Sequence, residues 1–437
     1  MANINGNGQN NTINGTSVAD TINAKGGSDV VNAGAGNDYV DGGSGDDILN
    51  GEDGADELIG GDGSDRLNGG AGDDILNGGA GIDMADFSGG AAVRVDLSTG
   101  AATGQGKDTL SNIENVWGSS FSDTLKGNAL ANQLYGNAGN DTFIASLGID
   151  LINGGDGLDS LSFAGSGAVT ANLATGVYAF DAQNRGTITR VEQLSGGSFN
   201  DTLTGDGGDN RLDGGAGDDV LAGGGGNDNL WGGAGVDRLI ADGGDDTMAG
   251  DYSWDGTRSA GVDIFEIRTN AHIVTITDFK LGVDKLDLTA FGFGTSNYWT
   301  GASVQAGSKT VMTLTGQGGE VVKINLDGVT QGQLMTVNDM IGGSASLIVP
   351  SPTYPMNGGN GLATIFVLNP TTGSQSITGF ENGLDRLDIT ALSSWGGALH
   401  TNSNSDAVLH FESGAQVVEF TIVGMPYYLI DASDYIM

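Results

Sequence analysis

The hydrophobic positions in the first part of the chain follow a nine-residue period. Between Asn5 and Ala85 the sequence divides into nine consecutive nonapeptides, such as NGGAGDDIL at 68–76. A polar, glycine-rich stretch comes first, and the ninth position is usually aliphatic, as at Leu49 and Leu58. Because neighbouring side chains of a strand point to opposite faces, each repeat predicts a tight turn followed by a short strand with one inward aliphatic residue.

The same frame returns twice further along the chain. It covers Trp117–Leu161 and Ser195–Met248, after which the repeats degrade. Two nonapeptides would make one coil, and stacked coils would enclose a thin aliphatic core between two parallel sheets. We therefore expect an all-β fold with three blocks of parallel β-roll, at residues 5–86, 117–161 and 195–260.

The segments between the blocks lack the period and resemble each other. Residues 87–116 form the first connector and 162–194 the second. Val93, Val95 and Leu97 alternate with polar residues in the first connector, which predicts a strand with one buried face.

The last part of the chain is richer in aromatic and β-branched residues, and it is also duplicated. Ile276–Phe291 matches Ile377–Leu392. We expect two β-rich modules at 261–342 and 362–437. The linker at 343–361 holds three of the five prolines.

Charge excludes several classes of protein. Lys and Arg number 16 and Asp and Glu 55, which gives a formal net charge of −39. A chain this acidic repels phosphate backbones, so nucleic acid is not an expected partner. The sequence contains no apolar stretch of about 18 residues, the length that would predict a membrane span. The absence of cysteine excludes disulfides and thiolate metal sites.

The acids are not scattered, because one of them recurs at the seventh position of the repeat. Stacked coils would bring these carboxylates together, and one aliphatic side chain per repeat offsets little of the entropy lost on ordering nine residues. A cation between the turns is therefore expected. Oxygen ligands without His or Cys select a hard ion, and Ca²⁺ tolerates their irregular geometry better than Mg²⁺. The expected ligands, for several Ca²⁺ ions, are Asp20, Asp29, Asp38, Asp47, Asp56, Asp65, Asp74, Asp83, Asp123, Asp141, Asp150, Asp159, Asp201, Asp219, Asp228, Asp237 and Asp246.

With these features the chain resembles the RTX (repeats-in-toxin) proteins with Gly- and Asp-rich nonapeptides. The resemblance implies a right-handed parallel β-roll stapled by calcium, in which the Asp of one turn and backbone carbonyls two repeats on share each ion. The region around 278–288 also resembles the C-terminal part of serralysin-type secreted proteins. Asp434–Met437, one acid followed by apolar residues, resembles the signal of type I secretion substrates. An ordinary terminal strand is the alternative for these four residues.

Some repeats depart from the pattern. Asn11, Asn132 and Asn210 replace the seventh-position Asp, and Ile144–Ile152 lacks the paired glycines. Calcium sites at these repeats are doubtful.

Nothing in the sequence indicates catalysis. The three histidines, His272, His400 and His410, form no His-Glu-x-x-His motif, and no Gly-x-Ser-x-Gly elbow occurs. Adjacent acids such as Asp46 and Asp47 are expected to divide into one metal ligand and one residue that faces water.

The leading hypothesis is a secreted, non-enzymatic protein that folds on Ca²⁺ outside the cell. Its role would be structural, at the cell surface: surface layer, matrix or adhesion. Expected partners are Ca²⁺, the type I secretion machinery, and either other copies of the chain or a cell-surface polysaccharide. The first residues lack the basic start and apolar run of an ordinary signal peptide. Alternatives are an accessory module of a secreted enzyme and a secreted effector or pore former.

Overall fold

The computed structural model is almost entirely β. It describes residues 2–180, 184–253, 256, 259–280, 283–291, 299–306, 310–316 and 321–327, and beyond these only short strands between 340 and 436. The chain separates into two compact units, Met1–Leu221 and Ala222–Met437.

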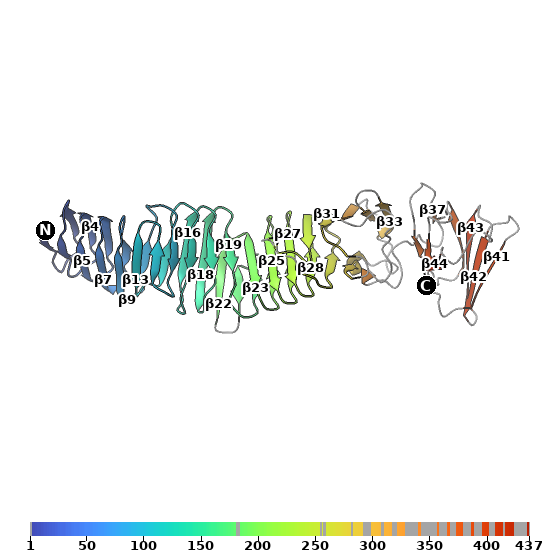
Figure 1. The fold of residues 1–437 in the computed structure, drawn as a ribbon, viewed down its shortest axis with the longest axis horizontal. Coiled ribbons are helices and arrows are strands. Elements are labelled where there is room, and N and C mark those ends of the chain that lie inside the picture. The colour runs from blue at the N-terminus through green and yellow to red at the C-terminus, as the bar shows by residue number, and fades with distance from the viewer. Residues whose placement is uncertain are drawn as a thin grey trace. The chain divides into compact units, whose positions relative to one another are not determined.

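The first unit contains two long sheets, drawn in blue to green in Figure 1. In the first sheet the strands lie side by side in the following order: β1 (Asn3–Asn5), β3 (Thr21–Asn23), β5 (Tyr39–Ser44), β7 (Glu57–Gly63), β9 (Ile75–Gly81), β13 (Lys107–Ser111), β12 (Ala101–Thr103), β11 (Arg94–Asp96), β15 (Thr124–Lys126), β17 (Thr142–Ile144), β19 (Ser160–Ser162), β23 (Gln193–Gly197) and β25 (Arg211–Ala216).

The second sheet of this unit is built in the same way. Its strands, in order, are β2 (Thr12–Thr16), β4 (Val30–Ala35), β6 (Ile48–Asp53), β8 (Arg66–Asn68), β10 (Met84–Asp86), β14 (Asn115–Trp117), β16 (Gln133–Ala138), β18 (Ile149–Asp156), β22 (Arg185–Thr189), β21 (Val177–Ala179), β20 (Thr170–Asn172) and β24 (Thr202–Thr204). β26 (Val220–Ala222) lies at the division between the units.

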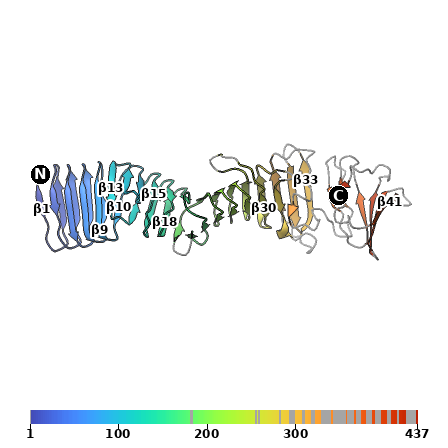
Figure 2. The same cartoon turned by 60° about the horizontal axis from the view of Figure 1, so that its bottom comes forward.

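Strands within the repeat blocks pair in parallel with partners 18 residues away, as β4 and β6 do with Val31 opposite Leu49. One coil is therefore two nonapeptides, as the period predicts. Figure 2 shows β1 and β9 in one row of the first unit. The ninth-position side chains face the space between the sheets, and Val40, Leu49 and Leu58 are fully buried.

Each connector adds an antiparallel excursion without ending the ladder. In the first, β11, β12 and β13 pair antiparallel, while β11 and β13 pair in parallel with β15 and β9. The strand expected at 93–97 is present as β11, and Val93, Val95 and Leu97 are buried. The second connector places β20, β21 and β22 in the opposite sheet.

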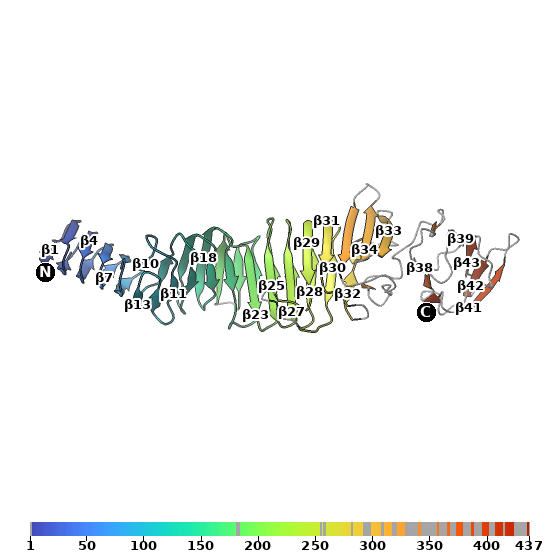
Figure 3. The same ribbon diagram turned by 45° about the horizontal axis from the view of Figure 1, so that its top comes forward.

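The second unit begins with the same arrangement. One sheet orders its strands as β27 (Asn229–Ala234), β29 (Gly244–Ala249), β31 (Ala271–Ile276), β35 (Val321–Leu326), β34 (Thr310–Gly316) and β33 (Trp299–Ala306). The facing strands are β28 (Arg238–Ala241), β30 (Ile264–Ile267), β32 (Lys285–Asp287) and β36 (Met340–Ile341). Figure 3 shows β29, β31, β30 and β32 together. A 3₁₀ turn, Thr289–Phe291, is the one helical element of the described residues.

The last part of the second unit repeats this pairing. A five-stranded sheet runs through β37 (Met356–Asn357), β39 (Gly373–Thr378), β43 (Gln416–Val423), β42 (Ala407–Ser413) and β41 (Gly396–Thr401). A three-stranded sheet contains β38 (Ile365–Val367), β40 (Arg386–Asp388) and β44 (Tyr435–Ile436).

The pairing order explains the internal sequence match. β30 pairs with β32 with Ile264 opposite Lys285, and β38 pairs with β40 with Ile365 opposite Arg386. β36 and β44 then add to the same edge of each pair. The all-β roll and the duplication are thus observed in the fold. The block, connector and linker boundaries stay predictions, and most of the linker at 343–361 lies outside the described residues.

The thin core makes each inward aliphatic residue important for stability. Leu49 is fully buried and its neighbour Ile48, on the same strand, is 39% exposed. We expect Leu49→Ala to lower the free energy of unfolding in saturating Ca²⁺ by about 2–5 kcal/mol, because it leaves a cavity. Ile48→Ala, the matched control, should change it by about 0.5 kcal/mol or less. Urea denaturation followed by circular dichroism measures both, and equal losses would contradict the assignment of the inward column.

Candidate metal sites in the turns

The seventh-position aspartates lie in the turns that join the two sheets, and the fold buries all of them. None of the seventeen residues expected from the sequence is more than 3% exposed. Their acidic neighbours differ, since Asp46 and Asp73 are exposed. Asp46 accepts a hydrogen bond from the Ser64 N–H, at 2.9 Å. The expected division of each acidic pair into one inner and one outer carboxylate is therefore observed.

The inner carboxylates join successive coils. Oδ1 of Asp47 accepts a hydrogen bond from the backbone N–H of Asp29, 18 residues earlier, at 2.7 Å. Oδ1 of Asp65 accepts from the N–H of Asp47 at 2.8 Å. The turns at the opposite edge carry the same ladder, in which Oδ1 of Asp56 accepts from Asp38 at 2.7 Å. Each carboxylate therefore orients the next along its edge.

The second oxygen of most of these carboxylates has no such partner. Within the described residues, Oδ2 is buried and accepts no hydrogen bond in Asp29, Asp38, Asp47, Asp56, Asp65, Asp74, Asp83, Asp141, Asp159, Asp201 and Asp246. Asp219, Asp228 and Asp237 are buried at the equivalent position of their repeats. An unpaired buried oxygen of an anion is costly, so each of the eleven turns with a free Oδ2, which we call open turns, requires a positive partner.

Glycine shapes the space beside the free oxygen. A Cβ atom placed on Gly42 would lie 2.6 Å from both Oδ2 of Asp47 and the carbonyl oxygen of Gly60. Gly43, four residues before Asp47, has a positive φ of 99°, which favours glycine because other residues are strained there. The second- and third-position glycines thus keep open a cradle in which a carboxylate and a carbonyl of the next coil converge.

A second kind of turn closes on itself. In Asp20 and Asp123, Oδ2 accepts a hydrogen bond from the backbone N–H four residues earlier, that of Thr16 at 2.7 Å and that of Ser119 at 2.6 Å. Oδ2 of Asp150 accepts from the Ser146 hydroxyl at 3.0 Å. We call these closed turns. Their carboxylates are buried as expected, but internal donors occupy the oxygen that is free in open turns.

Asparagine at the seventh position also gives closed turns. Oδ1 of Asn132 accepts from the Asn128 N–H at 2.8 Å, and its Nδ2 donates to the carbonyl oxygen of Glu114 at 2.7 Å. The Asn132 side chain therefore places an N–H donor in a turn where an aspartate would offer two oxygen atoms. This supports the doubt that the sequence raises about Asn132.

Burial changes the acidity of the open-turn carboxylates. Desolvation, with the neighbouring carboxylates adding to it, raises the pKa of Asp56 and Asp65 to about 6, against an ordinary value of 3.8. The same causes raise the pKa of Asp141 to about 7. In the closed turn of Asp20, hydrogen bonds from the Ala2 N–H and the Thr16 side chain instead lower the pKa, whereas burial still raises the pKa of the closed-turn Asp123 and Asp150. Burial therefore favours a proton or a cation at most of these carboxylates, and in open turns Oδ2 is free to take it.

The donor atoms fit calcium. Among the described residues, no three Asp, Glu or His side chains gather around one point, so a bound ion takes backbone carbonyls among its ligands. Carboxylate and carbonyl oxygens suit Ca²⁺, which accepts six to eight oxygen ligands in flexible geometry. Bound calcium would supply the positive charge, while Asp47 Oδ2 and the Gly60 carbonyl would hold it.

The structure adds acids that the nine-residue frame missed. Oδ1 of Asp108 accepts the N–H of Asp74 at 3.1 Å, and Oε2 of Glu114 accepts that of Asp83 at 2.9 Å. In the second unit, Asp263 accepts from Asp237 at 3.0 Å, and its Oδ2 is a further unpaired oxygen. The available signal was a shorter motif: an Asp two residues before a buried apolar residue, as in Asp108-Thr-Leu and Asp263-Ile-Phe.

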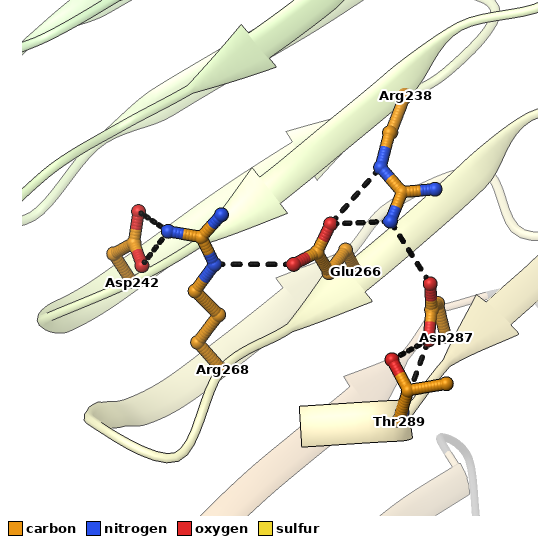
Figure 4. Close-up of polar contacts among 6 residues, drawn as sticks. All are labelled: Arg238, Asp242, Glu266, Arg268, Asp287 and Thr289. Atoms are coloured by element: carbon orange, nitrogen blue, oxygen red, sulfur yellow. Dashed lines mark hydrogen bonds and ion pairs between the residues drawn. The ribbon is translucent and has the colours of Figure 1, made fainter. Parts of the chain in front are cut away.

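Positive side chains cluster in the second unit (Figure 4). Arg238 binds Glu266 at 2.5 Å and Asp287 at 3.0 Å, and Arg268 binds Glu266 and Asp242, each at 3.1 Å. These groups lie on neighbouring coils, because Ile240, two residues after Arg238, pairs with Glu266 and Glu266 pairs with Asp287. Side-chain cations thus neutralise carboxylates on this sheet face.

Comparison with known families identifies the repeats. The model of the RTX calcium-binding nonapeptide repeat, four copies long, matches at 14–49, 50–85, 117–152, 135–165, 190–221 and 213–248. The matches fall on the three blocks and leave most of each connector unmatched. Comparison with curated proteins found no significant match.

Two solved structures show a weak similarity. The AlgE6R3 subunit of the Azotobacter vinelandii mannuronan C5-epimerase is 20% identical, with a TM-score of 0.21, over 35% of this chain and 84% of that one. The extracellular lipase LipA from Serratia marcescens is 17% identical, with a TM-score of 0.11, over 75% of this chain and 38% of that one. These TM-scores are too low to support any argument about this chain.

Open and closed turns predict different responses to the same substitution. Asp47→Asn places an amide donor in an open turn. It should reduce the number of bound Ca²⁺ ions and lower the unfolding free energy near millimolar Ca²⁺ by about 1 kcal/mol, the contribution of one site of millimolar affinity. Asp123→Asn, in a closed turn like that of Asn132, should leave the ion count unchanged. Calorimetric calcium titration of both variants checks this, and an equal ion count in the two would contradict the distinction.

The raised pKa values predict that protons replace calcium. Between 3.8 and about 6 to 7 the folded chain binds more protons than the unfolded chain, so its stability without metal falls as pH rises through this range. In EDTA, the β signal in circular dichroism should therefore grow as pH is lowered from 8 to 5. In saturating Ca²⁺ the signal at pH 8 should already be complete. A metal-free chain that loses structure on this acidification would contradict the prediction.

Proposed function

We propose that this chain is a secreted structural protein that folds when it meets calcium outside the cell. It carries RTX calcium-binding nonapeptide repeats folded as a β-roll, and it binds several Ca²⁺ ions. Its function is mechanical and adhesive, at the cell surface, and not catalytic. The observation that carries the proposal is the row of buried Oδ2 atoms without a partner, such as those of Asp47, Asp56 and Asp65.

The proposed ligands of these ions are the open-turn aspartates. A carbonyl oxygen of the next coil lies beside the free oxygen of Asp47, Asp56 and Asp65, that of Gly60, Gly69 and Gly78 respectively. Asp20, Asp123 and Asp150 belong to closed turns. Their Oδ1 atoms accept coil-to-coil hydrogen bonds from the N–H groups of Ala2, Val93 and Asn132. The seventeen aspartates therefore divide into ion ligands and structural acceptors.

Calcium dependence supports an extracellular location. Extracellular calcium modules bind at about 10⁻⁴–10⁻³ M, far above cytosolic concentrations of the free ion. A chain with a net charge of −39 repels itself when it has no ions. It therefore stays open enough for export and gains its structure only outside. The proposed export signal, Asp434–Met437, lies outside the described residues except for Tyr435–Ile436, which form β44.

The form of the described chain supports a structural role. Its parallel ladders are joined by short turns, and its outward strand positions, such as Asn32 and Asn50, are mostly polar. His272, the one histidine whose side chain is described, is exposed. The helical element among the described residues has three residues, too few to cross a membrane.

The proposal predicts that calcium controls both folding and assembly. The full chain should lose most of its β signal in EDTA at neutral pH and gain it steeply near millimolar Ca²⁺, because stacked turns order one another. Electron microscopy of the calcium-loaded protein should then show sheets or filaments. Mg²⁺ at equal concentration is the control and should support neither change.

Other outcomes would overturn the proposal. A chain fully folded in EDTA at neutral pH would remove its basis. Dispersed particles in Ca²⁺, together with hydrolysis of protein, lipid ester or polysaccharide by the pure chain, would favour an enzyme or enzyme module. Dye leakage from liposomes would favour a pore former.

A further inference from the structure

An open cavity of about 540 Å³ lies in the first unit beside the open turns of Asp56 and Asp74, whose third positions, Glu52 and Gly70, are part of its lining. Its side-chain lining includes the amides of Asn32, Asn50, Asn68 and Gln105 and the carboxylates of Glu52 and Asp53. The backbone of 89–91, in the first connector, completes the lining. No Lys, Arg or aromatic residue contributes to it. The cavity is therefore a polar groove with donors, acceptors and negative charge.

The floor of the groove is a column of asparagines at equivalent positions of successive strands. Asn32 pairs with Asn50, and Asn50 with Asn68, across β4, β6 and β8. Nδ2 of Asn50 donates to Oδ1 of Asn32 at 2.9 Å. Among the described residues, no side-chain hydrogen bond continues from there to Asn68. The column thus satisfies its own amides up to Asn50, and Asn68 presents a free amide to the groove.

The first connector builds the wall. Nε2 of Gln105 donates to the carbonyl oxygen of Phe87 at 3.1 Å, which joins the start of the connector to its later part. Gly90 lies against this side chain so closely that a Cβ there would collide with it. The wall is therefore held in place by contacts within the connector.

Glu52, at the lip of the groove, has a strained backbone. Its φ is 75°, at the third position of a repeat, where Gly43 and Gly61 stand in other repeats. Two other non-glycine residues have this conformation at the third position of a repeat, Lys25 with φ 80° and Asn137 with φ 75°, and Asn112 and Arg190 in the connectors also have a positive φ. Such a residue costs on the order of 1–3 kcal/mol, and strain of this kind concentrates at ligand-binding positions.

Side-chain bonds distinguish Glu52 from the other two. Nζ of Lys25 donates to the carbonyl of Gly6 at 3.0 Å, and Nδ2 of Asn137 donates to that of Gly118 at 2.6 Å. Both offset their strain within the fold. Within the described part of the chain, the carboxylate of Glu52 makes no hydrogen bond or ion pair. Glu52 is therefore kept at a strained position with its charge exposed at the groove.

We propose that this groove binds an uncharged saccharide chain, with Glu52 and Asn68 as its principal hydrogen-bonding groups. Saccharide hydroxyls both donate and accept, which matches an acceptor-only carboxylate beside amides that do both. The carboxylates of Glu52 and Asp53 exclude uronates and other acidic sugars. The asparagine column repeats at the strand spacing of about 4.8 Å, so a regular polymer meets equivalent amides in succession. The inference rests on the proposed cell-surface function, for which it supplies a ligand class.

The test titrates the calcium-loaded full chain with neutral hexasaccharides of glucose, mannose, galactose and N-acetylglucosamine, and with an oligo-uronate as the charged control, by calorimetry. At least one neutral hexasaccharide should bind with a dissociation constant below a millimolar, and the oligo-uronate should not bind. Tighter binding of the oligo-uronate than of every neutral sugar would overturn the proposal.

Variants separate binding from stability. Glu52→Gly removes the carboxylate and relieves the strain, so it should raise the urea midpoint while weakening saccharide binding at least tenfold. Lys25→Gly, at the equivalent position away from the groove, should leave saccharide binding unchanged. Unchanged binding in Glu52→Gly would sink the assignment.

Two further results keep the alternatives apart. Glu52→Gln retains hydrogen-bonding capacity, so it should keep part of the saccharide affinity. If the groove only held a cation, the loss of the charge in this variant would abolish binding altogether. Circular dichroism on the same samples reports folding. A chain that folds with Ca²⁺ but binds no neutral saccharide refutes the groove alone, and a chain that fails to fold with Ca²⁺ refutes the proposed function and this inference with it.

Discussion

The structure depends on buried carboxylates in which one oxygen accepts a hydrogen bond and the other has no partner. Oδ1 of Asp47 holds the N–H of the preceding coil, and Oδ2 meets a carbonyl of the following coil with no donor between them. The group that aligns the coils therefore also carries the charge that opposes their stacking. Since the aliphatic core is one side chain deep on each strand, it cannot outweigh this repulsion. A cation or a proton is needed in the turn, and folding becomes conditional on the medium.

The repeat period predicted the fold and the burial of the acids because both follow from register. A fixed spacing of nine residues puts Leu49 inward and Asp47 in the turn without further information. It did not separate open from closed turns, because that depends on whether the residue four before the acid donates to Oδ2, as Thr16, Ser119 and Ser146 do. In many open turns that residue has a positive φ, whether it is glycine, as at Gly43, or not, as at Lys25 and Glu52. Asp108 and Glu114 were missed because they accept from partners 34 and 31 residues away, outside the period.

The second unit meets the same electrostatic requirement partly with its own side chains. Nζ of Lys280 forms an ion pair with the fully buried carboxylate of Asp251, and Arg238 joins Glu266 to Asp287. The carboxylate of Asp251 raises the pKa of Lys280 despite the opposing effect of burial, so this ammonium stays charged. A tethered cation is present at every calcium concentration. Coils neutralised in this way depend less on the medium than coils whose carboxylates end in a free oxygen.

The division between turns and faces explains how a rigid repeat can carry specific recognition. Turn positions are constrained by the carboxylate ladder and by left-handed backbone, so most of them tolerate little change, and Glu52 is an exception that carries a proposed binding group. Outward positions of the strands are free of these constraints, so their residue type varies along the sheet. The column that holds Asn50 and Asn68 continues on later strands with Asp86, Trp117 and Tyr135. The first connector leaves the ladder unbroken, because Asp108 and Glu114 accept the N–H groups that the interrupted repeats would have bound. Its loop is thereby free to rise over the sheet face and form a wall, which adds a binding surface without removing a link on which the coils depend.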